Sequence, residues 1–183
     1  MVKGTRENII NAFFSLAAKY PDKYDFSIAD IACEAGISRQ AIYRNHFDNV
    51  NEIIKYIRHV IDDEVKAVMI CYQKEENVAI YFAENVLPIL YNRRQWLKLL
   101  YSSNIDPCWR RFLQKEYQPW FQNNLIFDPS KLNSNKEFIS KLIINHTLAI
   151  LEAWLSQDFP MPPEAFKKHF ITLLSTPVLS FLE

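Results

Sequence analysis

Glycine is nearly absent from this chain of 183 residues, which contains only two. A phosphate-binding loop of the glycine-rich kind needs several glycines close together, so nucleotide-binding sites of that kind are excluded. Few segments alternate apolar and polar residues in the way that half-buried strands do. The sequence therefore predicts an all-helical protein.

Cysteine and histidine are scarce and scattered. The three cysteines have no CxxC spacing, the four histidines have no HExxH or similar metal-binding spacing, and no GxSxG motif occurs. The sequence thus predicts no enzyme, no metal site and no cofactor. An odd number of cysteines without a signal sequence is typical of a reducing cytoplasm. No apolar run approaches the ~20 residues needed to cross a bilayer, so we expect a cytoplasmic protein.

Basic charge is not in excess either. The 21 Lys and Arg residues balance the 21 Asp and Glu residues. Residues 1–60 include eight basic and seven acidic side chains, a net charge of +1. A nucleic-acid binder usually carries a basic domain. Any DNA-binding face must then come from local clustering, and we expect the salt dependence of binding to be limited.

The most informative stretch is residues 27–47, SIADIACEAGISRQAIYRNHF. Ser27 and Asp30 have the spacing of a capping box at the start of a short helix. Gly36 is suited to a turn with positive φ, and Ser38 is suited to cap a second helix. The pattern predicts two short helices joined by a tight turn.

The second of these helices exposes Arg39, Gln40, Tyr43 and Arg44 on its outer face. Arginine suits guanine edges, glutamine suits adenine edges, and arginine and tyrosine suit phosphates. An ordinary pair of packed helices with a polar surface has the same pattern. The alternative stays open on these residues alone.

Residues 5–53 resemble the DNA-binding domain of a TetR-family transcriptional regulator. The similarity extends over a first helix that starts near Thr5, the stretch 27–43, Phe47 and the start of a long helix at Glu52. It implies a dimeric DNA-binding regulator, more often a repressor, that binds a near-palindromic operator. It also implies these DNA-contacting residues: Arg6, Ser27, Ser38, Arg39, Gln40, Tyr43, Arg44, His46 and Lys55.

Three positions depart from the family pattern. Tyr43 and Phe47 are separated by one extra residue, and Val50 stands where the family has a phosphate-contacting lysine. The residues PDKYDF at 21–26 replace a glycine. These differences predict a weaker grip on phosphate. They leave a second reading open, in which the protein is a ligand-binding or interaction module that keeps the fold and has lost strong DNA binding.

The remaining chain reads as a helical bundle, so we expect a DNA-binding domain at 1–48 and a ligand-binding and dimerisation domain at 49–183. Apolar spacing and capping residues predict about nine helices in total. Beyond residue 48 we expect helices at 49–72, 78–91, 95–103, from Asp106 onwards, 134–157 and 163–182.

The predicted helix 134–157 is apolar on two sides, and a helix of that kind must be covered on two sides. The last helix also has a wide apolar face. Two such helices suit a four-helix interface between two chains, as the resemblance also implies; burial of both inside one chain is the alternative. The expected interface residues are Ile144, Leu148, Leu151, Leu155, Phe170, Leu174 and Val178.

Aromatic side chains are concentrated between these segments and predict a pocket for a small apolar or aromatic effector. Each of them taken alone is more often an ordinary core residue. His146 is the most distinctive polar candidate, with a core hydrogen bond as its alternative role. The expected lining is Phe82, Trp96, Leu100, Tyr101, Trp109, Phe112, Tyr117, Trp120, Phe121 and His146.

Overall fold

The structure is a computed structural model of the chain and describes residues 2–23, 25–45, 47–74, 76–126, 128 and 134–181. These residues form ten α-helices and one short 3-10 helix, without a strand, which confirms the all-α class. The segment 78–91, expected as one helix, forms two. They are α5 (Val78–Asn85) and α6 (Leu87–Asn92), with Pro88 in the first turn of α6.

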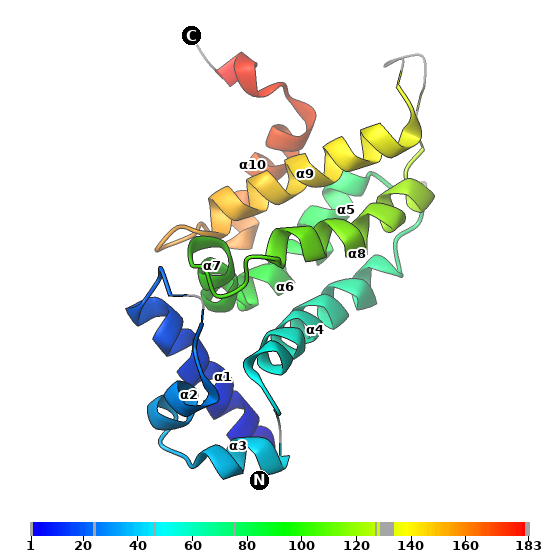
Figure 1. Cartoon of the computed structure of the whole chain (residues 1–183). Helices are drawn as coiled ribbons and strands as arrows, with labels where there is room; N and C mark the ends of the chain where they lie inside the picture. The colour runs from blue at the N-terminus through cyan, green and yellow to red at the C-terminus, as the bar shows by residue number, and fades with distance from the viewer. Residues whose placement is uncertain are drawn as a thin grey trace.

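Three helices form the N-terminal unit, which we call the head: α1 (Val2–Lys19), α2 (Ile28–Glu34) and α3 (Arg39–Asn45). Figure 1 shows them at one end of the molecule. Because α1 begins at Val2, Thr5 lies inside it and is not the expected N-cap.

The long helix α4 (Val50–Met69) connects the head to the rest of the chain (Figure 1). Asn49 caps it, accepting a hydrogen bond of 3.2 Å from the backbone N–H of Glu52. Its buried stripe includes Ile53 and Ile57, which are no more than 1% exposed. Burial of this stripe places α4 against both the head and the helices that follow.

The other long helices pack together above α4 (Figure 1). Helix α9 (Lys136–Leu155) lies along α8 (Trp109–Asn124), and α10 (Pro163–Ser175) packs against α5, α6 and α9. Phe170 and Leu155 are fully buried in this bundle. The remaining helices are α7 (Arg94–Ser102) and the 3-10 helix η1 (Val178–Phe181).

Two helix boundaries differ from the expected ones. Helix α8 begins at Trp109 because Asp106 is buried and its carboxylate accepts the N–H of Cys108 outside the helix. The last helix ends at Ser175 because Thr176 is extended, as a residue before proline prefers to be, and Pro177 follows.

The expected dimer interface is wrong for five of its seven residues. These side chains are at most 6% exposed within a single chain, so they have no surface to offer a second copy. Leu174 is half-buried, and the side chain of Val178 lies outside the described residues. The five buried residues are Ile144, Leu148, Leu151, Leu155 and Phe170.

Helix α9 is, within the described residues, the one helix long and apolar enough to cross a membrane by length and composition. Buried core helices pass the same test. Trp154 and Leu155 are at most 1% exposed, and the helix packs along α8. These contacts identify α9 as a core helix of the bundle.

Candidate nucleic-acid interface and interior cavity

Helices α2 and α3 are joined by the tight turn that the sequence predicted. The Ser27 hydroxyl accepts the backbone N–H of Asp30 at 3.1 Å, and the Asp30 carboxylate accepts the N–H of Ser27 at 2.9 Å. Gly36 has φ +66°, the left-handed region that glycine adopts without steric cost. Ser38 caps α3 by accepting the N–H of Ala41 at 3.2 Å. The capping box and the turn are therefore confirmed.

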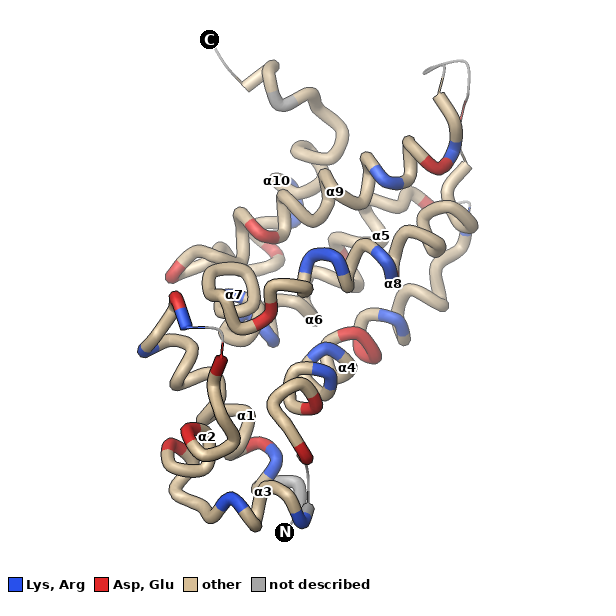
Figure 2. The backbone as a smooth tube through the Cα atoms, in the orientation of Figure 1, with Lys and Arg blue, Asp and Glu red and all other residues tan. Residues whose placement is uncertain are grey.

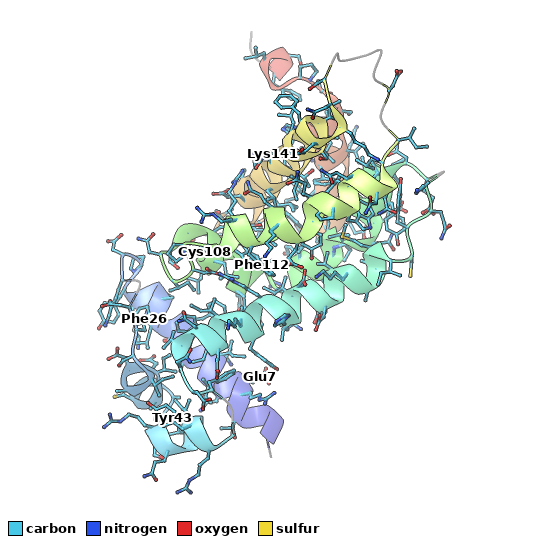
Figure 3. The ribbon with its side chains drawn as sticks, turned by 45° about the vertical axis from the view of Figure 1, so that its right-hand side comes forward. Glu7, Phe26, Tyr43, Cys108, Phe112 and Lys141 are labelled. Carbon is cyan, nitrogen blue, oxygen red and sulfur yellow. The ribbon has the colours of Figure 1, made fainter. Side chains whose placement is uncertain are left out.

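Helix α3 is anchored on one side and free on the other. Ile42 is fully buried in the head, which fixes the rotation of α3. Arg39, Gln40, Tyr43 and Arg44 are all exposed, and none of their side chains has a hydrogen bond or ion pair to another described residue. In Figure 3, Tyr43 lies on α3 at the outer end of the head. This free polar face is the geometry that insertion into a DNA groove requires.

The acidic side chains of α2 are engaged within the head. Lys19 and Ser15 donate to the Glu34 carboxylate at 2.6 and 2.5 Å, and these two hydrogen bonds lower the pKa of Glu34. The backbone N–H of Ser27 is the main cause of a lowered pKa at Asp30. Lys19 pairs with Glu34, and Lys23 pairs with Asp30. Helix α3 carries basic residues at this end of the molecule (Figure 2).

Other predicted phosphate contacts lie on helices other than α3 or outside the described residues. The Arg6 guanidinium lies over the ring of Tyr56, 5.4 Å from its centre, and so joins α1 to α4. Lys55 is exposed and lines a surface groove with Ile105 and Cys108. His46 lies outside the described residues. Ser27 is exposed and caps α2. The predicted residues that lie on α3 or cap it are Ser38, Arg39, Gln40, Tyr43 and Arg44.

An interior cavity of about 50 Å³ lies in the C-terminal bundle, lined by side chains from α4 to α9. Five of the ten residues expected to form a ligand pocket contribute to it. They are Phe82, Tyr101, Trp109, Tyr117 and Phe121.

The other five expected residues do not line this cavity, and four of them have identifiable partners elsewhere. Trp96 stacks on Phe14, and Phe112 lies between α4 and α8 beneath Arg58 (Figure 3). Trp120 donates to the Met69 carbonyl at 3.3 Å. His146 Nε2 is 2.9 Å from the Leu173 carbonyl, which is the core hydrogen bond expected as the alternative. The fifth residue, Leu100, is an ordinary core residue.

The charged group at the cavity is one that the sequence reading missed. Asp62 is 4% exposed and accepts the Tyr117 hydroxyl and the Lys66 ammonium, each at 2.7 Å. Lys66 also contacts Glu116 at 2.8 Å, and both carboxylates raise the pKa of Lys66. Burial and the Asp62 carboxylate raise the pKa of Tyr117.

The sequence holds a signal for this group. Arg58, Asp62 and Lys66 recur every four residues, so they share one face of α4. All three reach the connection before α8 or α8 itself: Arg58 binds Asp106 with an Nε–O distance of 2.7 Å, and the other two bind Tyr117 and Glu116.

The chain is similar to known proteins in both sequence and structure. A family described as the C-terminal region of transcriptional regulators (TetR_C_8) matches residues 79–176. A crystal structure of a TetR transcriptional regulator from Streptococcus agalactiae 2603V is similar over 96% of each chain, with TM-score 0.62 and 18% identity. The dihydroxyacetone kinase operon activator DhaS is similar over 93% of each chain, with TM-score 0.54 and 22% identity. No curated protein sequence matches the chain.

Proposed function

The chain belongs to the TetR family of transcriptional regulators, and from this premise we propose that it binds a near-palindromic DNA operator as a homodimer and acts as a cytoplasmic repressor. The observation that carries the proposal is the outer face of α3, where Arg39, Gln40, Tyr43 and Arg44 are exposed and unpaired within the described chain. A mobility-shift assay with the DNA upstream of its own gene tests it. Sequence-dependent binding is expected, and its absence at low salt would contradict the proposal.

We assign base contacts to Arg39, Gln40 and Arg44, and phosphate contacts to Tyr43 and Ser38. Bidentate arginine and glutamine contacts supply discrimination between bases, whereas phosphate contacts set the register on the duplex. One similar structure is named an operon activator, so the sign of regulation needs its own test. A reporter gene under the operator is expected to be more active when the regulator is deleted.

A second candidate function keeps the fold without strong DNA binding. Val50, Arg6 and Lys55 favour it, because Val50 cannot hold a phosphate, Arg6 lies over Tyr56, and Lys55 lines a separate groove. Sequence-independent and weak binding in the mobility-shift assay would support this function over the first.

The salt dependence of operator binding follows from the same positions. Each head offers few side chains to phosphates, so few counterions are released when two heads bind. We expect a slope of log affinity against log salt well short of about −10, the value for a protein with many phosphate contacts. The measurement is fluorescence anisotropy across a salt series, and a slope near −10 would contradict the assignment.

We place the surface for a second copy on the outward stripe of α9. Phe138 and Leu142 are 55% and 53% exposed, and exposed Ala149 and Ala153 continue the same stripe towards the end of the helix. Small residues at such positions let two helices approach closely. The apolar stripe supplies a hydrophobic contact that the buried face of α9 cannot.

Leu142→Glu is expected to convert the dimer to a monomer, because it introduces a charge that would be buried in the contact. Light scattering at micromolar concentration measures the mass. The matched control is Ile70→Glu, the same change at an 81% exposed residue after α4, which is expected to leave the dimer intact. A wild-type monomer, or a dimer unaffected by Leu142→Glu, would rule out this surface.

We further propose that a small apolar effector enters the interior cavity and changes the position of α4. Asp62 and Lys66 of α4 bind Tyr117 and Glu116 of α8 beside the cavity. Since α4 leads into the head, a ligand that separates α4 from α8 changes the distance between the two heads of a dimer. Loss of operator binding on effector addition is the expected consequence.

A further inference from the structure

Helix α10 stops short of the start of α9, so the first half of α9 has no part of α10 beside it. Trp154 of α9 stacks on Phe166 of α10, with 4.4 Å between the ring centres. Nearer the start of α9, His146 Nε2 lies 2.9 Å from the Leu173 carbonyl, so the two helices run antiparallel. Helix α10 then ends at Ser175. The ten residues of α9 before His146 extend about 15 Å further, at 1.5 Å per residue.

This half of α9 carries two large apolar side chains that are exposed. Phe138 is 55% exposed and Leu142 is 53% exposed. Leu142 is four residues before His146, and in an antiparallel neighbour the matching position is four residues after Leu173, which is Pro177. A proline disfavours the helical conformation of the residue before it, so α10 ends at the point where its next turn would have covered Leu142.

Residues 176–181, which we call the arm, leave the bundle at this point and are also apolar. Leu179 is 77% exposed and Phe181 is 51% exposed, and the arm contains no charged residue. The Ser180 hydroxyl bonds within the arm, to the Pro177 carbonyl at 2.6 Å. Figure 1 shows η1 beyond α9, on the side of the bundle away from α4 and separate from the start of α9. The arm therefore leaves the exposed side chains of its own α9 uncovered.

Each chain thus has an exposed apolar arm and, in register beside it, an uncovered apolar half of α9. A second copy matches both features, because in a two-fold contact each arm meets the same surface of the other copy and the burial is doubled. The surface that we assign to the homodimer includes this half of α9. Ala149 and Ala153 of that surface are small and exposed, which lets two α9 helices approach there and leaves the larger side chains to be covered by another segment.

We propose that the two copies of the dimer exchange arms, so that Leu179 and Phe181 of one copy pack on the uncovered half of α9 in the other. The inference names the segment that covers this part of the dimer surface, and it rests on the homodimer proposed above. The competing occupants are the arm of the same chain and the α9 helix of the other copy.

Cross-linking between two differently marked full-length chains tests the exchange. One chain is tagged and carries Leu179→Cys, and the other is untagged and carries Leu142→Cys or Phe138→Cys. We expect a short bismaleimide to link the co-expressed chains into a product of mixed mass. Ile70→Cys in the untagged chain is the matched control, at an 81% exposed residue after α4, and should give no mixed product. In all chains the three native cysteines, which are exposed, are replaced by serine: Cys33, Cys71 and Cys108.

Removing the apolar side chains of the arm is expected to weaken the dimer. For Leu179→Ser with Phe181→Ser, the dimer Kd should rise about 100-fold or more, because two arms together bury four large apolar side chains. Ile70→Ser with Tyr20→Ser changes an aliphatic and an aromatic residue that are likewise exposed, at 81% and 56%, and should leave the Kd within about threefold. Analytical ultracentrifugation measures the Kd, and circular dichroism checks that the helices are retained.

Three results would overturn the exchange of arms. The first is a link at the mass of one chain when Leu179→Cys and Leu142→Cys are combined in it, which would place the arm on its own α9. The second is no mixed product from chains that light scattering shows to be dimeric. The third is a Kd unchanged by the two serine substitutions, which would show that the α9 helices contact each other without the arms. The last two results leave the homodimer standing, whereas a monomeric wild type would overturn both proposals.

Discussion

Replacing Arg39 by alanine is expected to weaken operator binding by about 2–6 kcal/mol, since a symmetric dimer loses a bidentate contact worth about 1–3 kcal/mol in each of two half-sites. This corresponds to a loss of roughly 30-fold to 10⁴-fold in affinity. Arg39 is exposed and unpaired within the described chain, so the substitution leaves the head folded. Fluorescence anisotropy with the operator and with unrelated DNA measures the effect.

The matched control is Arg111→Ala, which removes an exposed arginine from α8 with the same change in charge. It should leave operator affinity within about threefold of the wild type, as expected for a charge far from the DNA. Gln40→Ala should relax the preference for adenine at a neighbouring base pair. If Arg39→Ala and Arg111→Ala behave alike, α3 does not carry base recognition.

Replacing Arg58 by methionine is expected to lower the free energy of unfolding by about 3–5 kcal/mol, the usual cost of leaving one buried charge of an ion pair without its partner. Arg58 binds Asp106, whose side chain is 3% exposed. The substitution also removes the guanidinium from the face of Phe112. Urea unfolding at neutral pH gives the free energy.

A double substitution separates the buried charge from general loss of packing. Adding Asp106→Asn to Arg58→Met removes the unpaired carboxylate and keeps an acceptor for the Cys108 N–H, so the double variant should be more stable than Arg58→Met alone. Lys98→Met serves as the control, because its partner Asp158 is 79% exposed and surface pairs contribute less than about 1 kcal/mol. A double variant less stable than Arg58→Met would refute the role of the buried charge.

The head was predictable from the sequence because its signals are local. The capping box at Ser27 and the turn at Gly36 depend on residues within four positions of each other, and both are present as expected. Asn49 and Asn135, which cap α4 and α9, likewise accept hydrogen bonds from N–H groups three residues along the chain. Local hydrogen bonds require no knowledge of the tertiary fold.

The expected dimer interface and the cavity were harder to predict from the sequence, because both depend on which face of a helix packs against which neighbouring helix. Helix α9 has two apolar faces, and the stripe through Ile144 and Leu148 is buried against its own chain while Phe138 and Leu142 point outwards. The periodicity of α9 alone cannot distinguish these two faces. The role of Asp62 was missed for a related reason, since its partner Tyr117 lies 55 residues away.

The most direct test of the central claim, that two copies of α3 read DNA together, is selection of bound sequences from random DNA by the wild type and by Arg39→Ala. The wild type is expected to enrich an inverted repeat with half-site centres about one helical turn, or a whole number of turns, apart. Arg39→Ala should lose the preference at one base pair in each half-site. No enriched sequence, or the same sequence enriched by both proteins, would contradict the claim.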